Sequence, residues 1–144
     1  MKLSKIARLR ILSAFALCVP FASLAAETEA SPILGNSANG HEQFVRKCAS
    51  CHTVDPGGRS YLGPNLHGVF GRVVGSYEGF RYGPPYLAAA RAGEVWTPER
   101  TFAYLLDPTA MFKGGRMILR IRDETIRADL TAYLLSISPE YRSK

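Results

Sequence analysis

Two cysteines and a histidine lie within five consecutive residues, in the sequence Cys48-Ala49-Ser50-Cys51-His52. This C-x-x-C-H spacing is the pattern that attaches a c-type haem. The two thiols are placed to reach two vinyl groups on one edge of a porphyrin, and the adjacent imidazole can bind the iron from below. The motif therefore predicts one covalently attached haem c, with Cys48 and Cys51 as its thioether tethers and His52 as an axial iron ligand.

Three other kinds of site use the same residue types. A structural zinc site needs a fourth ligand, commonly from a second pair at similar spacing, and only His41, His67 and Cys18 remain. A thioredoxin-like dithiol is expected within a β-α-β pattern, but no hydrophobic strand precedes the motif. A disulfide between Cys48 and Cys51 would close a tight, strained ring. The five-residue motif is more specific than these alternatives and favours haem.

An iron bound by one histidine has a sixth position, whose ligand separates electron carriers from oxygen or peroxide chemistry. Met117, Met111 and a second histidine have suitable donor atoms. Met117 follows Gly114-Gly115, and glycines give a loop the freedom to turn its sulfur inward. Met111 lies near Pro108 and fits the usual role of methionine as a core filler. Met117 is therefore the predicted second axial ligand, with Met111 next.

Turn and cap residues divide the rest of the chain into short helical segments. A first helix is expected from about Asn39, a candidate N-cap, up to the haem motif. Another begins at Pro84-Pro85 and ends before Gly93. A third begins at Thr97-Pro98 and closes at Asp107-Pro108, because a proline disfavours helical backbone at the residue before it. These segments must bring the candidate ligands together.

Asp123 is the predicted N-cap of the last helix. The apolar residues of that helix recur at helical spacing and form one stripe: Ile126, Leu130, Tyr133, Leu134 and Ile137. Residues 53–83 carry too many glycines for a regular helix or long strands. A loop of that length is unusual in a small domain, but a haem would supply hydrophobic surface for it to wrap. The pattern predicts an all-α fold of short helices around a cofactor.

The N-terminal segment resembles a secretory signal. Residues 1–26 hold four basic residues, then an apolar stretch, then small residues suited to cleavage. The apolar stretch is shorter than the ~20 residues that a membrane-spanning helix needs, and Pro20 interrupts it. The prediction is a cleaved signal peptide over 1–26, a flexible leader over 27–38, and one domain over 39–144 in the periplasm.

The charge of the chain does not point to nucleic acid. The net charge is +6, but residues 1–26 contribute four basic residues and no acidic ones, so the rest of the chain carries about +2. No basic run interleaved with aromatic residues follows the signal. Nucleic-acid partners are therefore excluded from the prediction.

Taken in order, the motifs resemble the class I c-type cytochromes, of the soluble mitochondrial cytochrome c and bacterial cytochrome c2 kind. The matching residues and segments are Gly40, Phe44, 48–54, 63–72, 79–82, Trp96, Tyr104-Leu105, Asp107-Pro108, Met117 and 129–134. The resemblance implies the cytochrome c fold, with four to five short helices and loops wrapped around one covalently bound haem. It also implies that Gly40 and Phe44 pack the first helix against Leu130 and Tyr133 of the last.

The same resemblance assigns roles to residues around the haem. It places the carbonyl of Pro64 against the free nitrogen of His52 and turns Tyr104 toward the sulfur of Met117. It makes three residues partners of a buried haem propionate: Arg72, Tyr82 and Trp96. Lys113 and Gly115 stand where the family usually has proline and threonine, so this loop is expected to be less rigid.

The resemblance implies a soluble periplasmic electron carrier and not an enzyme, with a low-spin haem c between His52 and Met117. It implies a monomer without a small-molecule substrate, which touches membranes only through partner complexes. An exposed haem edge would meet redox proteins inside a basic rim formed by Arg46, Lys47, Lys113 and Arg116. The alternatives are a dedicated electron-transfer subunit of a periplasmic dehydrogenase or oxidase, and, less favoured, a peroxidase-like or gas-binding cytochrome with a labile sixth ligand.

Overall fold

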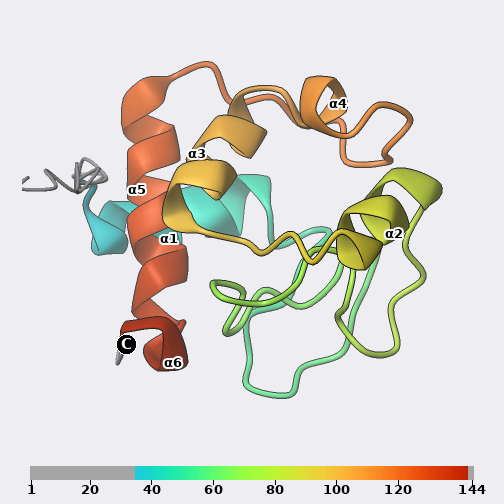
Figure 1. The fold of residues 1–144 in the computed structure, drawn as a ribbon. Helices are drawn as coiled ribbons and strands as arrows, with labels where there is room; N and C mark the ends of the chain where they lie inside the picture. The colour runs from blue at the N-terminus through green and yellow to red at the C-terminus, as the bar shows by residue number, and fades with distance from the viewer. Residues whose placement is uncertain (1–34, 143–144) are drawn as a thin grey trace, which may run out of the picture.

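Six helices and long connecting loops make up the described part of the protein. The structure is a computed structural model that describes residues 35–142, so the predicted signal peptide and most of the predicted leader lie outside it and stay predictions. The helices are α1 (Ser37–Lys47), α2 (Pro84–Arg91), α3 (Pro98–Leu106), α4 (Pro108–Met111), α5 (Glu124–Ser136) and α6 (Pro139–Arg142) (Figure 1). Within residues 35–142 the only β-type pairing is an isolated bridge between Val73 and Val95. The all-α prediction is confirmed.

The predicted helix ends near the middle of the chain are also confirmed. The Thr97 hydroxyl accepts a hydrogen bond from the Arg100 N–H at the start of α3. The Asp123 carboxylate accepts one from the Ile126 N–H at the start of α5. Gly93, with φ +70°, follows α2. These ends were predictable because each depends on residues only a few positions apart.

The first helix begins earlier than predicted. Asn36, not Asn39, is the N-cap of α1, and its side chain accepts a hydrogen bond from the Asn39 N–H. The Asn36 N–H in turn donates to the carboxylate of Asp129 on α5, at 2.7 Å. This long-range bond anchors the start of α1. None of the helices in residues 35–142 has both the length and the apolar character needed to span a membrane.

Two single-turn helices, α4 and α6, were not predicted from the sequence. Asp107 ends α3 and also caps α4, since its carboxylate accepts from the N–H groups of Thr109 and Ala110. One residue therefore closes one helix and opens the next. The short α4 leads into the loop that carries Met117.

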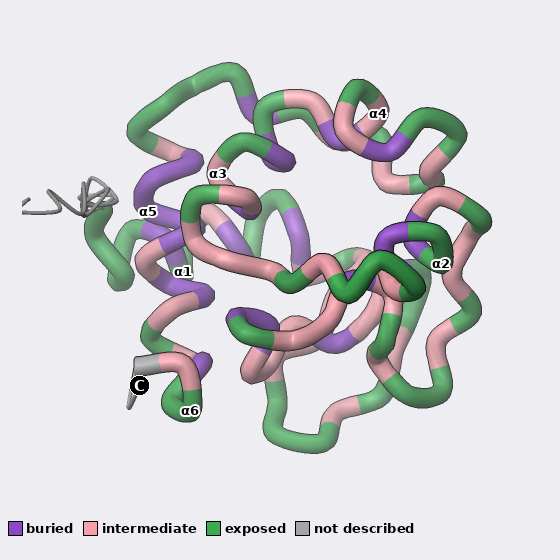
Figure 2. The backbone as a smooth tube through the Cα atoms, in the orientation of Figure 1, coloured by how far each residue is buried: buried purple, intermediate pink, exposed green. Residues whose placement is uncertain are grey.

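Helices α1 and α5 cross on one side of the molecule, with α2 on the opposite side (Figure 1). Much of α5 is buried at this crossing, and other buried residues lie on α2, near α4 and in the loops (Figure 2). Phe44 of α1 packs on Tyr133 of α5, with ring centroids 5.5 Å apart, and both belong to one core cluster with Leu130. The predicted packing of the first helix on the last is confirmed. Because α1 ends beside Cys48, this crossing positions the haem motif.

Residues 53–83 contain no helix, as their glycine content predicted. The buried Asn65 side chain organises the first part of this loop. Its amide group donates to the Thr53 hydroxyl at 2.8 Å and to the Asp55 carbonyl at 3.0 Å, and its oxygen accepts from the His67 N–H. A buried and fully bonded side chain of this kind holds an irregular backbone in one conformation. The loop is thereby fixed beside His52.

Candidate functional site

A mainly apolar cavity of about 290 Å³ lies between the helices and the long loop. Every site residue predicted from the sequence lines it: Cys48, Cys51, His52, Pro64, Arg72, Tyr82, Trp96, Tyr104 and Met117. These residues come from the turn after α1, from the loop over 53–83, from the segment between α2 and α3, from α3 itself and from the loop after α4. The fold therefore brings together residues that are almost 70 positions apart in the sequence.

The two cysteines and His52 lie on a short turn that continues α1. The N–H groups of Cys51 and His52 both donate to the Cys48 carbonyl, each at 2.9 Å, and the Cys48 N–H donates to Phe44. Cys48 is buried and Cys51 is half-buried. The turn presents both sulfurs and the imidazole to one cavity, as a doubly tethered ring requires.

The chemistry of the thiols disagrees with the three alternative sites. Both cysteines are free, so they do not form a disulfide. Burial raises the pKa of Cys48 to about 11, whereas a reactive dithiol needs an accessible thiolate. Within residues 35–142, no three histidine, cysteine, aspartate or glutamate side chains are grouped to hold a metal ion.

The orientation of His52 is fixed by a backbone carbonyl. Its Nδ1 lies 2.7 Å from the oxygen of Pro64. A carbonyl can only accept, so Nδ1 carries the proton and the lone pair of Nε2 is free for a metal. Burial lowers the pKa of His52, which keeps the ring neutral at neutral pH. Gly63 lies directly against this ring, since a Cβ built there would be 2.2 Å from Cε1.

Met117, and not Met111, lines the cavity. Both methionines are half-buried against the same cluster of Val74, Tyr86, Ala89, Tyr104 and Phe112. The two other histidines of the described chain do not line the cavity: His41 packs on Tyr133 at the helix crossing, and His67 lies in the loop. Of these four residues only Met117 lines the cavity, and its role as the second iron ligand stays a prediction.

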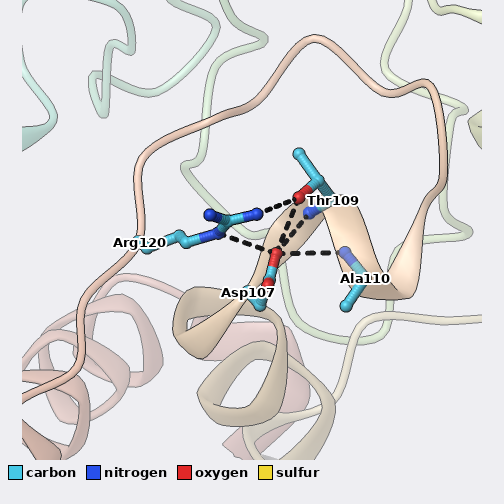
Figure 3. Close-up of polar contacts among 4 residues, drawn as sticks. All are labelled: Asp107, Thr109, Ala110 and Arg120. Atoms are coloured by element: carbon cyan, nitrogen blue, oxygen red, sulfur yellow. Dashed lines mark hydrogen bonds and ion pairs between the residues drawn. The ribbon is translucent and has the colours of Figure 1, made fainter.

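The segment that carries Met117 is closed at its base by Asp107 (Figure 3). The carboxylate accepts from the N–H groups of Thr109 and Ala110 and from the Thr109 hydroxyl. Arg120, which follows Met117 in the chain, lies 3.0 Å from the same carboxylate and also donates to the Thr109 hydroxyl at 2.7 Å. These bonds join the two ends of a loop from residue 107 to residue 120.

Acidification is expected to weaken this closure. The Thr109 hydroxyl, followed by the Ala110 N–H and Arg120, holds the pKa of Asp107 below its ordinary value. A carboxyl whose pKa is lower in the folded state stabilises that state at neutral pH, and this stabilisation is lost as the pH falls through the lowered pKa. Wild-type holoprotein should therefore lose more stability than Asp107→Asn between pH 7 and pH 3.

Denaturant unfolding of both proteins at the two pH values measures that difference. Asparagine is an equally good N-cap, so Asp107→Asn keeps the cap and removes the titration together with the charge that pairs with Arg120. Because all other carboxyl groups are shared, their contributions cancel in the comparison. Equal losses of stability in the two proteins would show that Asp107 does not couple the loop to pH.

Arg72, Tyr82 and Trp96 line another part of the cavity. The Arg72 guanidinium donates to the carbonyl of Asn65 at 2.8 Å and to that of His67, and it lies 4.7 Å above the Tyr77 ring. Burial lowers the pKa of Arg72. The guanidinium therefore supports the loop beside His52 while it faces the cavity, and its contact with a haem propionate stays a prediction.

Sequence reasoning missed two polar residues of the cavity wall. Tyr86 of α2 was predicted only as a helical residue, yet its hydroxyl lies 2.9 Å from that of Tyr104. Thr101 of α3 also lines the cavity. Its buried hydroxyl has no hydrogen-bond partner among the described residues. Helical spacing placed neither residue in the site, because the cavity that they line forms only in the folded chain.

The residues present fit a tethered porphyrin. The cavity walls are apolar over most of their area, and a buried hydroxyl such as that of Thr101, without a protein partner, costs free energy unless another group completes it. Two thiols, a neutral imidazole and a thioether are the donor set expected for a c-type haem. The fit supports the prediction made from the motif.

The predicted basic rim is exposed at all four positions, Arg46, Lys47, Lys113 and Arg116. Arg46 pairs with Glu42 at 3.3 Å on α1, and Arg116 donates to the Arg81 carbonyl. Two large apolar residues are also exposed, Leu62 at 80% and Ile118 at 75%. Leu62 lines the cavity, and Ile118 follows Met117. An apolar and partly basic surface therefore adjoins the cavity.

Comparison with known proteins gives one consistent result. The chain is 38% identical to cytochrome c2 iso-2 of Rhodospirillum centenum over 120 residues, which cover 74% of this chain and 98% of that protein. It is 40% identical to cytochrome c of Nigella damascena over 103 residues, 69% and 88% of the two chains. The solved structure of cytochrome c2 from Rhodospirillum centenum matches with a TM-score of 0.69 and 39% identity, covering 73% of this chain and all of that one. No family model matches.

Proposed function

This chain belongs to the class I c-type cytochromes and binds one haem c, and on that premise we propose that it is a periplasmic electron carrier with its iron between His52 and Met117. One observation carries the proposal. A single apolar cavity is lined by both thiols, by an imidazole with a free Nε2, and by a thioether. The relatives named cytochrome c2 and cytochrome c support the same function.

The haem, when bound, supplies an iron that gains and loses one electron. The chain's own residues set the conditions for that exchange. Pro64 fixes the imidazole of His52 through Nδ1, and the closed loop from residue 107 to residue 120 holds Met117. The apolar wall excludes water and disfavours additional positive charge, which raises the reduction potential. Groups held in place in this way also change little in geometry on electron transfer.

The surface beside the cavity supports a brief encounter with redox proteins. Leu62 and Ile118 are exposed next to the cavity wall, where apolar contact with a partner can replace contact with water. The basic rim would steer acidic partners and make the encounter sensitive to salt. The predicted signal at residues 1–26 supports the periplasmic location. A separate experiment, release of the protein from membranes at high salt, would distinguish a free carrier from a tightly bound subunit.

The cavity disfavours the enzymatic alternative. Peroxide or gas chemistry needs an open sixth position and an acid–base group beside it. In the described chain, Met117 is one of the wall residues, and the cavity lining contains no carboxylate and no second histidine. We therefore propose electron transfer without catalysis of a chemical step.

Met117→His is the substitution that tests this proposal. Replacing methionine by histidine is expected to abolish the weak methionine-to-iron band in the near-infrared spectrum of the oxidised protein. It should also lower the reduction potential by a measurable part of the ~0.8 V range that axial ligands span. Met111→Leu is the matched control, because Met111 packs on the same cluster but does not line the cavity. Loss of the band in the Met111 variant, or its absence from the wild-type protein, would contradict the proposal.

A further inference from the structure

Phe112 is the buried anchor of the loop that carries Met117. It is 5% exposed, whereas none of residues 113–120 is buried. Its N–H donates to the Pro108 carbonyl at 2.9 Å, and its carbonyl accepts from the Gly115 N–H at 2.8 Å. Met117 packs against the cluster of buried residues to which Phe112 belongs. Displacement of the Phe112 ring would therefore displace the start of the segment that leads to Met117.

Three aromatic rings and one cation pack on Phe112. Its ring centroid lies 4.7 Å from that of Tyr86, 5.7 Å from that of Tyr104 and 6.0 Å from that of Trp96. The cation comes from α3, where the guanidinium carbon of Arg100 lies 5.8 Å from the centroid of the Phe112 ring. A guanidinium within about 6 Å of a ring face is attracted by the π electrons of that ring. Arg100 therefore adds an electrostatic contact to an anchor that is otherwise held by apolar packing.

The hydrogen bonds of Arg100 leave part of its guanidinium without an oxygen partner. Nη2 donates to the Glu94 carboxylate, but Nε is buried and has no hydrogen-bond partner among the described residues. A buried donor normally has an acceptor, because an unpaired one costs free energy. The Phe112 ring is the electron-rich group beside this guanidinium, and N–H groups form weak hydrogen bonds to aromatic faces. Attraction to the ring accounts for a nitrogen that no oxygen satisfies.

Glu94 holds the guanidinium over the aromatic ring. This residue is itself fixed, since its N–H donates to the Ala89 carbonyl at 3.1 Å and its carbonyl accepts from the Val74 N–H at 2.7 Å. The side chains of Arg100 and Glu94 are only 29% and 36% exposed, so water screens their attraction less than on an open surface. The Arg100 N–H also donates to the Thr97 hydroxyl at 3.1 Å. Both ends of the Arg100 side chain are therefore held in place.

We propose that Arg100 is a positioning residue for Met117. Held by Glu94, its guanidinium keeps the Phe112 ring in the aromatic cluster, and this anchor keeps the loop closed with Met117 at the cavity wall. The proposal rests on Met117 as the sixth ligand, as in the proposed function. Without the guanidinium, the loop should be open for a larger fraction of the time, with the sixth position of the iron accessible to a small ligand from solution.

Imidazole binding to the oxidised holoprotein measures this opening. At pH 8 imidazole is mostly uncharged, so its approach does not depend on the charge that a substitution removes. A ligand that binds only the open form has an apparent affinity proportional to the open fraction. Arg100→Gln should therefore raise the apparent affinity about threefold to tenfold, the range expected for a partly buried cation over a ring. Glu94→Gln, which leaves Arg100 in place but releases its guanidinium, should raise the affinity in the same direction.

Two further variants separate the proposed contact from a general effect. Arg91→Gln removes the same charge from an exposed position of α2 and should leave the imidazole affinity within about twofold of wild type. Phe112→Leu keeps an apolar side chain but removes the ring face. Because Arg100 acts through that ring, Arg100→Gln should change the affinity by less than about twofold in the Phe112→Leu background. The effect of the leucine itself cancels, since both proteins in that comparison carry it.

The loss of the methionine-to-iron band during the titration reports imidazole binding. A higher affinity in Arg100→Gln and Glu94→Gln, absent from Arg91→Gln and lost in the Phe112→Leu background, supports the proposal. Wild-type affinity in either of the first two variants, an equal rise in Arg91→Gln, or an undiminished rise in the Phe112→Leu background overturns it and leaves Met117 ligation intact. If Arg100→Gln gives no holoprotein, Glu94→Gln decides, with a rise in support and wild-type affinity against. Absence of the band from the wild-type protein overturns the ligation, and this inference with it.

Discussion

Gly63→Ala is expected to weaken the binding of the iron by His52. A Cβ at position 63 would lie 2.2 Å from Cε1 of the imidazole and 2.6 Å from both ring nitrogens. Carbon atoms in van der Waals contact are about 3.5–4.0 Å apart, so the ring must move by more than an ångström. The ring cannot move without losing the 2.7 Å hydrogen bond from Nδ1 to Pro64. Alanine at this position therefore acts directly on the ligand.

The free-energy cost of the substitution should reach the upper end of what overpacking causes, about 1–3 kcal/mol. The obstructed imidazole ring is already held by the hydrogen bond from Nδ1 to Pro64, so it has little freedom to move. We expect a roughly ten- to hundredfold fall in the ratio of native to displaced ligation. The displaced form should show high-spin absorption and a lowered potential. Visible spectra of the oxidised and reduced protein, with the ratio of haem to protein, measure this change.

Gly83→Ala is the matched control for that experiment. The nearest atom to a Cβ at position 83 is Pro85 Cδ at 3.8 Å, an ordinary contact, and Gly83 has φ −76°, which alanine adopts without strain. The control should keep the low-spin spectrum. A native spectrum and potential in Gly63→Ala would show that His52 is not held against residue 63 in solution.

The sequence was sufficient for the parts of this fold that depend on neighbouring residues. The haem motif, the caps at Thr97 and Asp123, and the glycine after α2 each depend on a few adjacent positions. Met117 was preferred to Met111 because two glycines precede it, and of the two only Met117 lines the cavity, while its role as a ligand stays a prediction. In each case the preference comes from neighbouring residues, so it is present before the chain folds and agrees with the final structure.

The parts that the sequence did not reveal depend on contacts between distant segments. Asn36 and Asn39 are equal as cap residues, and the choice between them follows from the bond of Asn36 to Asp129 on α5. The Tyr86–Tyr104 pair joins two helices whose approach no periodicity reports. The loop before Met117 was expected to be less rigid because of Gly115, yet that glycine is where Tyr86 packs. The absence of a side chain at Gly115 therefore makes room for the Tyr86 hydroxyl, in addition to making the backbone more flexible.

Gly40→Ala is expected to destabilise the whole domain, although alanine favours helix. In an isolated helix, this change would stabilise by about 1 kcal/mol. In the protein, a Cβ at position 40 would lie 2.0 Å from the backbone oxygen of Asp129 and 2.7 Å from Tyr133 Cβ. Backbone atoms of a packed helix cannot turn aside as a long side chain can. Helices α1 and α5 must separate, and their shared core must loosen.

We expect a net loss of about 3 kcal/mol, the upper range of overpacking costs, which corresponds to roughly 10–20 °C in the melting temperature of a domain of this size. Thermal and denaturant unfolding of the holoprotein measure it. Val45→Ala, at a 56% exposed position of the same helix, should stay within about 0.5 kcal/mol of wild type. The sign of the Gly40 effect is the decisive result. A Gly40→Ala protein at least as stable as wild type would mean that helix propensity outweighs the clash, so α1 and α5 would not be in close contact. A large loss means that this crossing holds α1, and with it the haem motif that follows, in place.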